Sequence, residues 1–128
     1  MDPPRSPADP RRIVVIGPCA SGKTSLTARL QRLGYDAHAC GQEHSDIPGL
    51  WRHLAPDVVI GLRIELDTLR RRRAPGWSGE IYARQIGRLR SAYAHAHLVV
   101  DADTIDQDTV LAEVVGWLQD HPATPATA

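Results

Sequence analysis

The residues best suited to chemistry lie near the start of the chain, where residues 17–24 read G-P-C-A-S-G-K-T. Gly17 and Gly22 permit a tight loop whose backbone N–H groups turn inward, and a helix starting near Lys23 points its positive dipole end at the same place. Lys23, the single lysine of the 128 residues, can place a positive charge on phosphates, and the Thr24 hydroxyl is placed to bind Mg²⁺. This spacing predicts a phosphate-binding loop.

The residues expected to contact a nucleotide are the loop itself and the first turn of the helix that follows it. They are Gly17, Pro18, Cys19, Ala20, Ser21, Gly22, Lys23, Thr24 and Ser25. Cys19 has two interpretations, because the loop amides and Lys23 could lower the pKa of its thiol, whereas a small residue could also simply fill space there. Oxidation of Cys19 would be expected to obstruct nucleotide binding.

A metal bound to phosphates needs a carboxylate besides the Thr24 hydroxyl. Glu43 is the preferred candidate, because the polar run 42–45 directly follows an expected strand; the alternative is that this run is only a solvated turn. Asp36, Asp101 and Asp103 are the competing carboxylates. A base that takes the proton of a phosphoryl acceptor would be Glu43 or Asp36.

Phosphoryl transfer also needs cations on the charge that develops between donor and acceptor. Arginines cluster at residues 70–73, ahead of Pro75-Gly76 and Trp77, and Arg84 and Arg88 lie four residues apart on the next expected helix. This segment has the composition of a lid that brings catalytic arginines to the phosphates. The alternative is an ordinary solvated helix face.

The elements that must position these residues alternate between strand and helix. Strands are expected at residues 13–16, 35–40, 57–64 and 97–101, and helices at 23–33, 50–54, 65–73, 79–96 and after a capping box formed by Thr104 and Gln107. This order predicts an α/β fold, a three-layer α/β/α sandwich with a parallel sheet of four to five strands. One domain is expected over residues 11–120, with disordered tails at 1–10 and 121–128.

Composition narrows the classes of function. The 15 basic and 15 acidic residues cancel, which argues against a broad nucleic-acid or membrane surface. The sequence contains neither a span long enough for a bilayer nor a signal core, so a cytoplasmic protein is expected. The two cysteines are too few for a disulfide framework or an all-thiol zinc site, and the histidines have no spacing typical of a metal site.

The chain resembles the P-loop kinase branch of the P-loop NTPases, the group of adenylate, shikimate and gluconate kinases. The matching segments are G-P-C-A-S-G-K-T-S, then P-D-V-V-I-G-L-R with its arginine-rich helix, then A-R-Q-I-G-R-L-R up to L-V-V-D-A-D. The resemblance implies a reduced P-loop NTPase fold, ATP and Mg²⁺ as cofactors, and a small-molecule phosphoryl acceptor. It assigns Lys23, Thr24 and Ser25 to the phosphates and metal, and makes the arginines of residues 70–73, Arg84 and Arg88 lid candidates.

One region departs from that family. Residues 34–56 are too few for the acceptor-binding subdomain and additional strand, with its acidic metal partner, that familiar members carry there. The acceptor site could be reduced, rebuilt from residues 41–53, or supplied by a second subunit, which would make the protein a homodimer.

Three other functions are open. The run D-I-P-G at residues 46–49 has the form of a GTPase switch, but the chain contains no asparagine for guanine recognition, so a turn into the next helix is preferred. A nucleotide-binding module without turnover would keep the loop and lack the acceptor site. An NTP hydrolase acting on a protein partner would release phosphate without any small-molecule acceptor.

Overall fold

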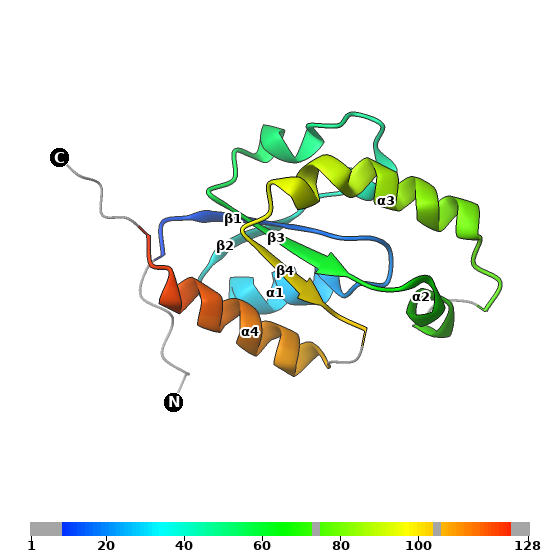
Figure 1. Ribbon diagram of the computed structural model, residues 1–128. Helices are drawn as coiled ribbons and strands as arrows, with labels where there is room; N and C mark the ends of the chain where they lie inside the picture. The colour runs from blue at the N-terminus through cyan, green and yellow to red at the C-terminus, as the bar shows by residue number, and fades with distance from the viewer. Residues whose placement is uncertain (1–8, 73–74, 104–105, 124–128) are drawn as a thin grey trace.

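The sheet has four parallel strands in the order β2-β1-β3-β4 (Figure 1). The computed structural model describes residues 9–72, 75–103 and 106–123. The strands are β1 (Arg12–Ile16), β2 (Asp36–Ala39), β3 (Val58–Arg63) and β4 (Leu98–Asp101). Val15 of β1 is in register with Ala39 on one side and with Ile60 on the other. The predicted α/β fold with a parallel sheet is confirmed.

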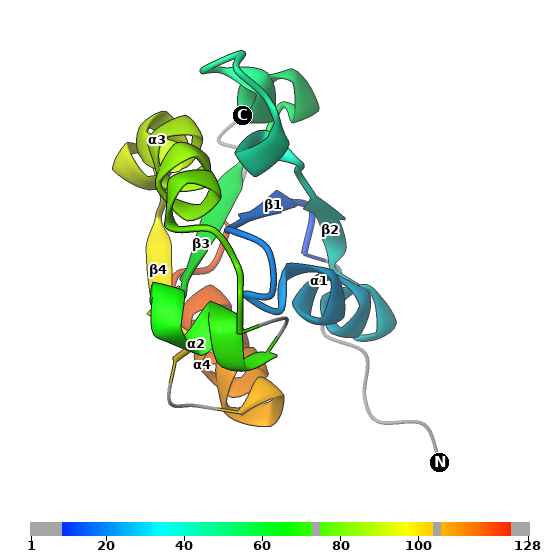
Figure 2. The same ribbon diagram turned by 90° about the vertical axis from the view of Figure 1, so that its right-hand side faces the viewer.

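Helices cover both faces of this sheet. They are α1 (Lys23–Arg32), α2 (Leu66–Arg72), α3 (Gly79–Ala94) and α4 (Gln107–Asp120), with short 3₁₀ helices η1 (Gln42–His44) and η2 (Leu50–Leu54). Helices α1 and α4 pack side by side on one face, while α3, η1 and η2 lie on the other (Figures 1 and 2). Helix α2 lies beyond the carboxyl end of β3.

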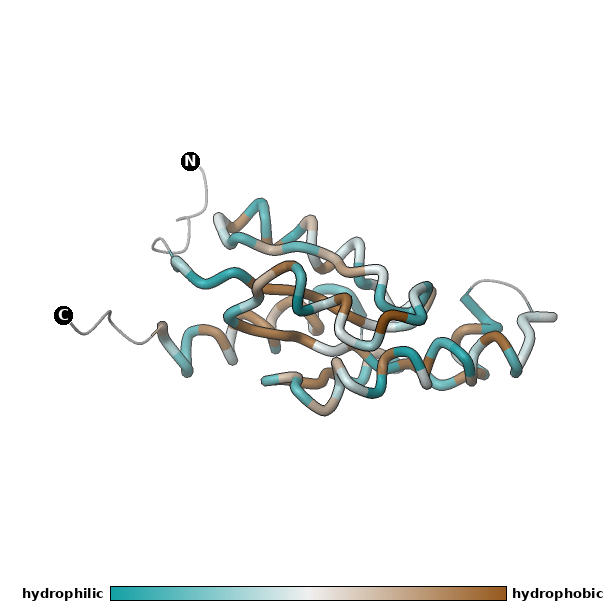
Figure 3. The backbone as a smooth tube through the Cα atoms, turned by 90° about the horizontal axis from the view of Figure 1, so that it is seen from above, coloured by the Kyte–Doolittle hydropathy of each residue, from teal (hydrophilic) through white to brown (hydrophobic). Residues whose placement is uncertain are grey.

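Strand β1 contributes to the core on both sides, which is why its sequence is continuously apolar. Ile13 and Val15 belong to the cluster under α1 and α4, whereas Val14 and Ile16 belong to the cluster under α3 and η2. All four side chains are fully buried. Figure 3 shows the hydrophobic residues concentrated along the central strands.

The expected boundaries agree with the structure to within two residues in the elements that are fully described. Thr104 lies outside the described residues, and so do Arg73 and most of the expected tails, at 1–8 and 124–128. Helix α4 begins at Gln107, and its N-cap is Asp106, whose side chain accepts a hydrogen bond from the N–H of Thr109 at 2.8 Å. Among the described residues, no helix is sufficiently long and apolar to cross a membrane.

The parallel sheet brings several loops to one edge. The carboxyl ends of β1 and β2 are neighbours, so the loop at residues 17–22 lies beside the segment at residues 40–44 that follows β2. The expected turn at residues 46–49 leads into η2, with the N–H of Leu50 donating to the carbonyl of Ile47 at 3.2 Å. Ligands of open parallel sheets collect at this edge.

Candidate phosphate-binding site at the carboxyl edge of the sheet

The loop between β1 and α1 has a backbone that requires glycine at both ends. Gly22, the N-cap of α1, has φ of 90°, in the left-handed region that side chains disfavour. A Cβ on Gly17 would lie 2.7 Å from the Ser21 hydroxyl and 3.0 Å from the carbonyl oxygen of Leu62. Ala20 also has positive φ, 63°. The two glycines of the motif are therefore explained by backbone conformation and close packing.

The start of α1 offers free hydrogen-bond donors to the cavity beside it. The first N–H groups of a helix have no intrahelical acceptor, and within the described residues no side chain caps those that follow Gly22. The cavity has a volume of about 480 Å³ and is open to solvent. Its lining consists of residues 18–25 on one side and Ala39, Cys40, Gly41, Glu43 and His44 on the other. The predicted nucleotide-contacting residues from Pro18 to Ser25 thus share one wall, whereas Gly17 does not line the cavity.

Lys23 crosses this cavity to the opposite wall. Its ammonium donates to the carbonyl of Cys40 at 3.0 Å and to that of Gly17 at 3.4 Å, and it forms an ion pair with the Glu43 carboxylate. The side chains of Lys23 and Glu43 are 12% and 4% exposed. Glu43 Oε1 is buried and has no hydrogen-bond partner among the described residues. The sequence prediction placed both residues in the site, and the structure brings them into direct contact.

Gln85 of α3 holds the loop at residues 17–22 from the other face of the sheet. The backbone N–H of Cys19 donates to Gln85 Oε1 at 3.1 Å, and Gln85 Nε2 donates to Cys19 Sγ at 3.3 Å. Gln85 is 3% exposed. Sequence reasoning missed this residue because Gln85 lies between the apolar positions Tyr82 and Ile86, and a buried polar residue there has no distinctive pattern.

The two cysteines differ in their surroundings. Cys19 is partly exposed at the cavity, with His44 Nε2 at 3.8 Å from its sulfur. Cys40 is 4% exposed, and burial raises the pKa of its thiol. Both residues line the cavity, and Cys19 is the more exposed of the two.

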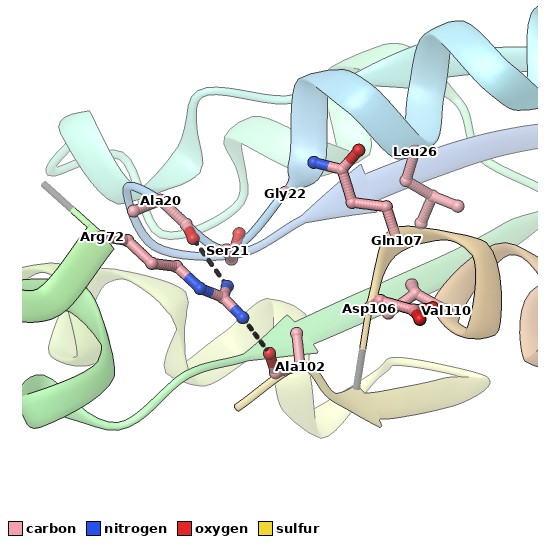
Figure 4. A pocket seen from close by; sticks show the side chains of 9 residues that line it. All are labelled: Ala20, Ser21, Gly22, Leu26, Arg72, Ala102, Asp106, Gln107 and Val110. Atoms are coloured by element: carbon pink, nitrogen blue, oxygen red, sulfur yellow. Dashed lines mark hydrogen bonds between the residues drawn. The ribbon is translucent and has the colours of Figure 1, made fainter. Parts of the chain in front are cut away.

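One arginine of α2, Arg72, contacts the far side of the loop at residues 17–22. Arg72 Nη1 donates to the carbonyl of Ala20 at 3.0 Å, and Nη2 donates to the carbonyl of Ala102 (Figure 4). These contacts close one side of a second cavity of about 280 Å³, which also includes apolar Leu26 and Val110 and polar Asp106 and Gln107. Of the expected lid residues that the structure describes, Arg72 alone touches this cavity and the loop together.

Arg84 and Arg88 occupy a different place from the one expected. Arg88 donates to the backbone carbonyl of Glu43 at 3.3 Å and to Asp46 at 2.8 Å, while Arg84 is exposed. Both line a groove of about 580 Å³ between α3 and residues 45–48, and neither lines the cavity of the phosphate loop. The structure thus separates them from the loop, because α3 presents Gln85 to Cys19 and turns the arginines toward the groove.

Three of the candidate carboxylates lie away from Lys23. Asp36 is at the start of β2, at the opposite edge of the sheet, where it pairs with His38. Asp101 and Asp103 follow β4, where Asp103 accepts from the N–H of Glu65 at 2.6 Å and Asp101 accepts from the N–H of Asp103 at 3.1 Å. Desolvation works against ionisation of Asp103, but the hydrogen bonds it accepts outweigh it and hold its pKa below the ordinary value. Among the four candidates, Glu43 is the one that reaches the loop.

The loop hydroxyls differ in their availability. Thr24 is exposed in the cavity, whereas the Ser25 hydroxyl donates to Gln107 Oε1 at 3.0 Å and so links α1 to α4. The Ser21 hydroxyl is buried without a partner among the described residues. Thr24 therefore has the freest hydroxyl of the three for a ligand in the larger cavity.

No model of a known protein family matches the sequence. A comparison with curated proteins finds no match either. The residues themselves therefore carry the functional interpretation: one wall of the cavity provides an ammonium, a hydroxyl and free backbone N–H groups, and the other provides a carboxylate.

Proposed function

We propose that the chain is an ATP-binding protein of the P-loop kinase type, with a reduced P-loop NTPase fold, which transfers the γ-phosphoryl group of ATP to a small-molecule acceptor. The observation that carries the proposal is the meeting of Lys23 with Glu43 beside the uncapped start of α1. A cation, a carboxylate and free helix N–H groups at one cavity are the groups that phosphates and their metal require.

The loop would bind the phosphates mainly through its backbone. The N–H groups at the start of α1 face the cavity, and Lys23 would exchange its contact with Glu43 for the β and γ phosphates. The Cys19 N–H is already bound to Gln85, so this donor would position the loop instead of binding the ligand. Lys23 would then stabilise the negative charge that develops during transfer.

The residues present fit Mg²⁺. Mg²⁺ prefers oxygen ligands, and the cavity presents the Thr24 hydroxyl together with the Glu43 carboxylate, one of whose oxygens is buried without a partner among the described residues. When bound, the metal would neutralise charge on the phosphate oxygens. Glu43 would hold it there once Lys23 has turned to the phosphates.

The nucleotide base would occupy the second cavity. That cavity adjoins the phosphate loop at residues 20–22, has apolar walls from Leu26, Ala102 and Val110, and ends in polar Asp106 and Gln107 (Figure 4). Apolar walls with a few polar groups are typical of sites for flat organic ligands. Arg72 would act as the lid residue, since it already joins the loop to the end of β4.

The acceptor would approach from the side of η1 and α3. Arg88 contacts the backbone of Glu43, and with Arg84 and Arg90 it lines the groove beside that residue. Three arginines favour an anionic acceptor. Because β2 and β3 are connected only by η1, η2 and their turns, this connection leaves no separate acceptor-binding subdomain; a second subunit completing the groove would explain the reduced size.

The shortness of the same connection supports a second candidate, a nucleotide-binding module without turnover. That module would bind ATP at the same loop and release no ADP. Binding therefore tests the site, and turnover tests the reaction.

The deciding experiment is a calorimetric titration of MgATP, MgADP and MgGTP into the wild type, Lys23→Ala and the control Arg32→Ala, followed by an assay of ADP formation with and without a pool of small metabolites. Arg32 is an exposed cation at the other end of α1. The proposal expects binding to the wild type and to Arg32→Ala, weakening of at least about tenfold in Lys23→Ala, and ADP formation that depends on the acceptor. Equal binding to all three proteins would refute the site, and binding without turnover would favour the module.

A further inference from the structure

Three side chains with the chemistry of transition-metal ligands meet at the mouth of the larger cavity. Cys19 comes from the phosphate loop, and Glu43 and His44 come from η1. One ligand atom from each lies within 4.8 Å of the others. His44 Nε2 is 3.8 Å from Cys19 Sγ and 3.8 Å from Glu43 Oε2. Glu43 and His44 are 24 and 25 positions from Cys19 in the chain. The cluster therefore cannot be predicted from a local sequence motif.

The spacing is close to that of a tetrahedral zinc site. Zinc binds thiolate sulfur at about 2.3 Å and imidazole nitrogen or carboxylate oxygen at about 2.0 to 2.2 Å, which places the ligand atoms about 3.5 Å apart. The two separations from His44 Nε2, each 3.8 Å, exceed that edge by only a few tenths of an ångström, and the ligand atoms of Cys19 and Glu43 lie within 4.8 Å of each other. A rotation of the exposed His44 ring could supply this adjustment, because its side chain is 64% exposed.

A second and independent observation also points to a ligand here. Glu43 is 3% exposed, yet its Oε1 has no hydrogen-bond partner among the described residues. Buried polar atoms are normally paired, because an unpaired one loses its hydration without compensation. The oxygen near His44 is Oε2, which also pairs with Lys23. A cation bound by both oxygens of this carboxylate would give Oε1 its missing partner.

We propose that Cys19, Glu43 and His44 form a binding site for Zn²⁺, with water as the fourth ligand. Sulfur and imidazole nitrogen select zinc over Mg²⁺ or Ca²⁺, which prefer oxygen ligands alone. On binding, the Cys19 thiol releases its proton to solvent, His44 coordinates through unprotonated Nε2, and Glu43 coordinates as the carboxylate. Gln85 Nε2, at 3.3 Å from Cys19 Sγ, holds the sulfur in place as an outer-sphere hydrogen-bond donor.

Zinc in this position would prevent the nucleotide phosphates from binding in the cavity. It would take the carboxylate that pairs with Lys23 and would lie between the two walls of the cavity. Zinc would therefore inhibit nucleotide binding competitively, a consequence that rests on the proposed function. Occupancy of the zinc site itself does not rest on it.

The test uses the untagged full chain and Co²⁺ as a spectroscopic substitute for Zn²⁺. The expected result is a one-to-one titration with thiolate-to-cobalt charge-transfer absorption and the intense visible bands of a four-coordinate ion, both removed by one equivalent of Zn²⁺. Cys19→Ser should abolish the charge-transfer band, and His44→Ala should weaken binding by about 10- to 100-fold. His53→Ala, which removes another exposed histidine, should change neither. Cys40 is present in every variant and serves as the internal thiol control.

Urea denaturation of each variant shows that a lost signal does not come from unfolding. The proposal is overturned if the folded wild type gives no thiolate band, or if the folded Cys19→Ser protein binds as well as the wild type. A separate titration of MgATP with and without Zn²⁺ tests the competition. Zinc binding without any nucleotide binding would support the metal site and refute the proposed function. Nucleotide binding without zinc binding would refute the metal site and leave the proposed function standing.

Discussion

Lys23 and Glu43 form a nearly buried ion pair across the carboxyl ends of the two neighbouring strands β1 and β2. Each side chain comes from the segment that directly follows its strand, and the exposed fractions are 12% and 4%. The pair holds the loop cation in position and leaves one carboxylate oxygen unpartnered among the described residues. Both residues are therefore tied to stability and, under the proposed function, to ligand binding, and mutations can separate these effects.

Lys23→Met should destabilise the protein by about 3 kcal/mol, because it leaves the Glu43 carboxylate buried without its partner. The double variant Lys23→Met with Glu43→Gln should recover most of this loss, since the remaining amide carries no charge. Urea denaturation at neutral pH measures both free energies of unfolding. If the double variant is no more stable than Lys23→Met, the ion pair does not explain the loss. Nucleotide binding should be weakened by at least about tenfold in both variants, because neither has the ammonium.

Glu43→Gln should separate nucleotide binding from metal support. Lys23 loses its competing carboxylate in this variant, so ATP without Mg²⁺ should bind at least as tightly as it does to the wild type. Any Mg²⁺-dependent turnover should fall by about 100-fold or more, because the proposed metal ligand and base is lost. Calorimetry with EDTA and with Mg²⁺, and an ADP assay, provide the comparison. Asp36→Asn is a matched control, because that carboxylate lies at the opposite edge of the sheet and pairs with His38; turnover falling equally in Asp36→Asn would contradict the role of Glu43.

The conformation of the loop at residues 17–22 and the place of Lys23 can be predicted from sequence, because fixed glycine positions report directly on local backbone conformation. Glu43 is also accessible to such reasoning, since it follows a strand and parallel strands end at a common edge. The contact between Gln85 and Cys19 cannot be predicted in this way, because it depends on how α3 packs across the sheet. The meeting of Cys19 with His44 depends on β2 pairing directly with β1, which is a tertiary relationship.

The arginines show the same limit. Helical periodicity places Arg84 and Arg88 on neighbouring turns, but it does not determine which element that surface meets. In the structure the buried Gln85 faces the loop and Arg88 meets η1. Arg72 reaches the loop instead, because α2 follows directly from the end of β3. Local pattern placed arginines on both helices, and packing decided which of them lies at the loop.

Substitutions at Ala20 and Gly22 should change stability in opposite directions. Both residues have positive φ, 63° and 90°, where a side chain costs about 1 to 2 kcal/mol. Gly22→Ala should therefore destabilise the fold by roughly that amount, whereas Ala20→Gly should be neutral or stabilising by up to about 1 kcal/mol after the greater chain entropy of glycine is included. Urea denaturation checks both. Gly76→Ala is a control, because a Cβ there meets nothing within 4 Å and the residue has no positive φ. Destabilisation of equal size by Ala20→Gly and Gly22→Ala would contradict the loop conformation.

Asp106 should give the protein a component of stability that disappears in acid. The backbone N–H of Thr109 donates to its carboxylate and holds the pKa of Asp106 below its ordinary value. A depressed folded-state pKa stabilises the fold above the unfolded-state pKa of about 4, and this contribution is lost as the pH falls through the lower folded-state value.

Asn at position 106 also accepts the hydrogen bond but does not ionise. The wild type should therefore exceed Asp106→Asn in stability at pH 7, and the difference should shrink steadily below about pH 4. Urea denaturation of both proteins across this range measures it, and the neighbouring ion pair between Arg29 and Asp108 is present in both. A stability difference that stays constant down to about pH 2 would show that the carboxylate's charge has no part in capping α4.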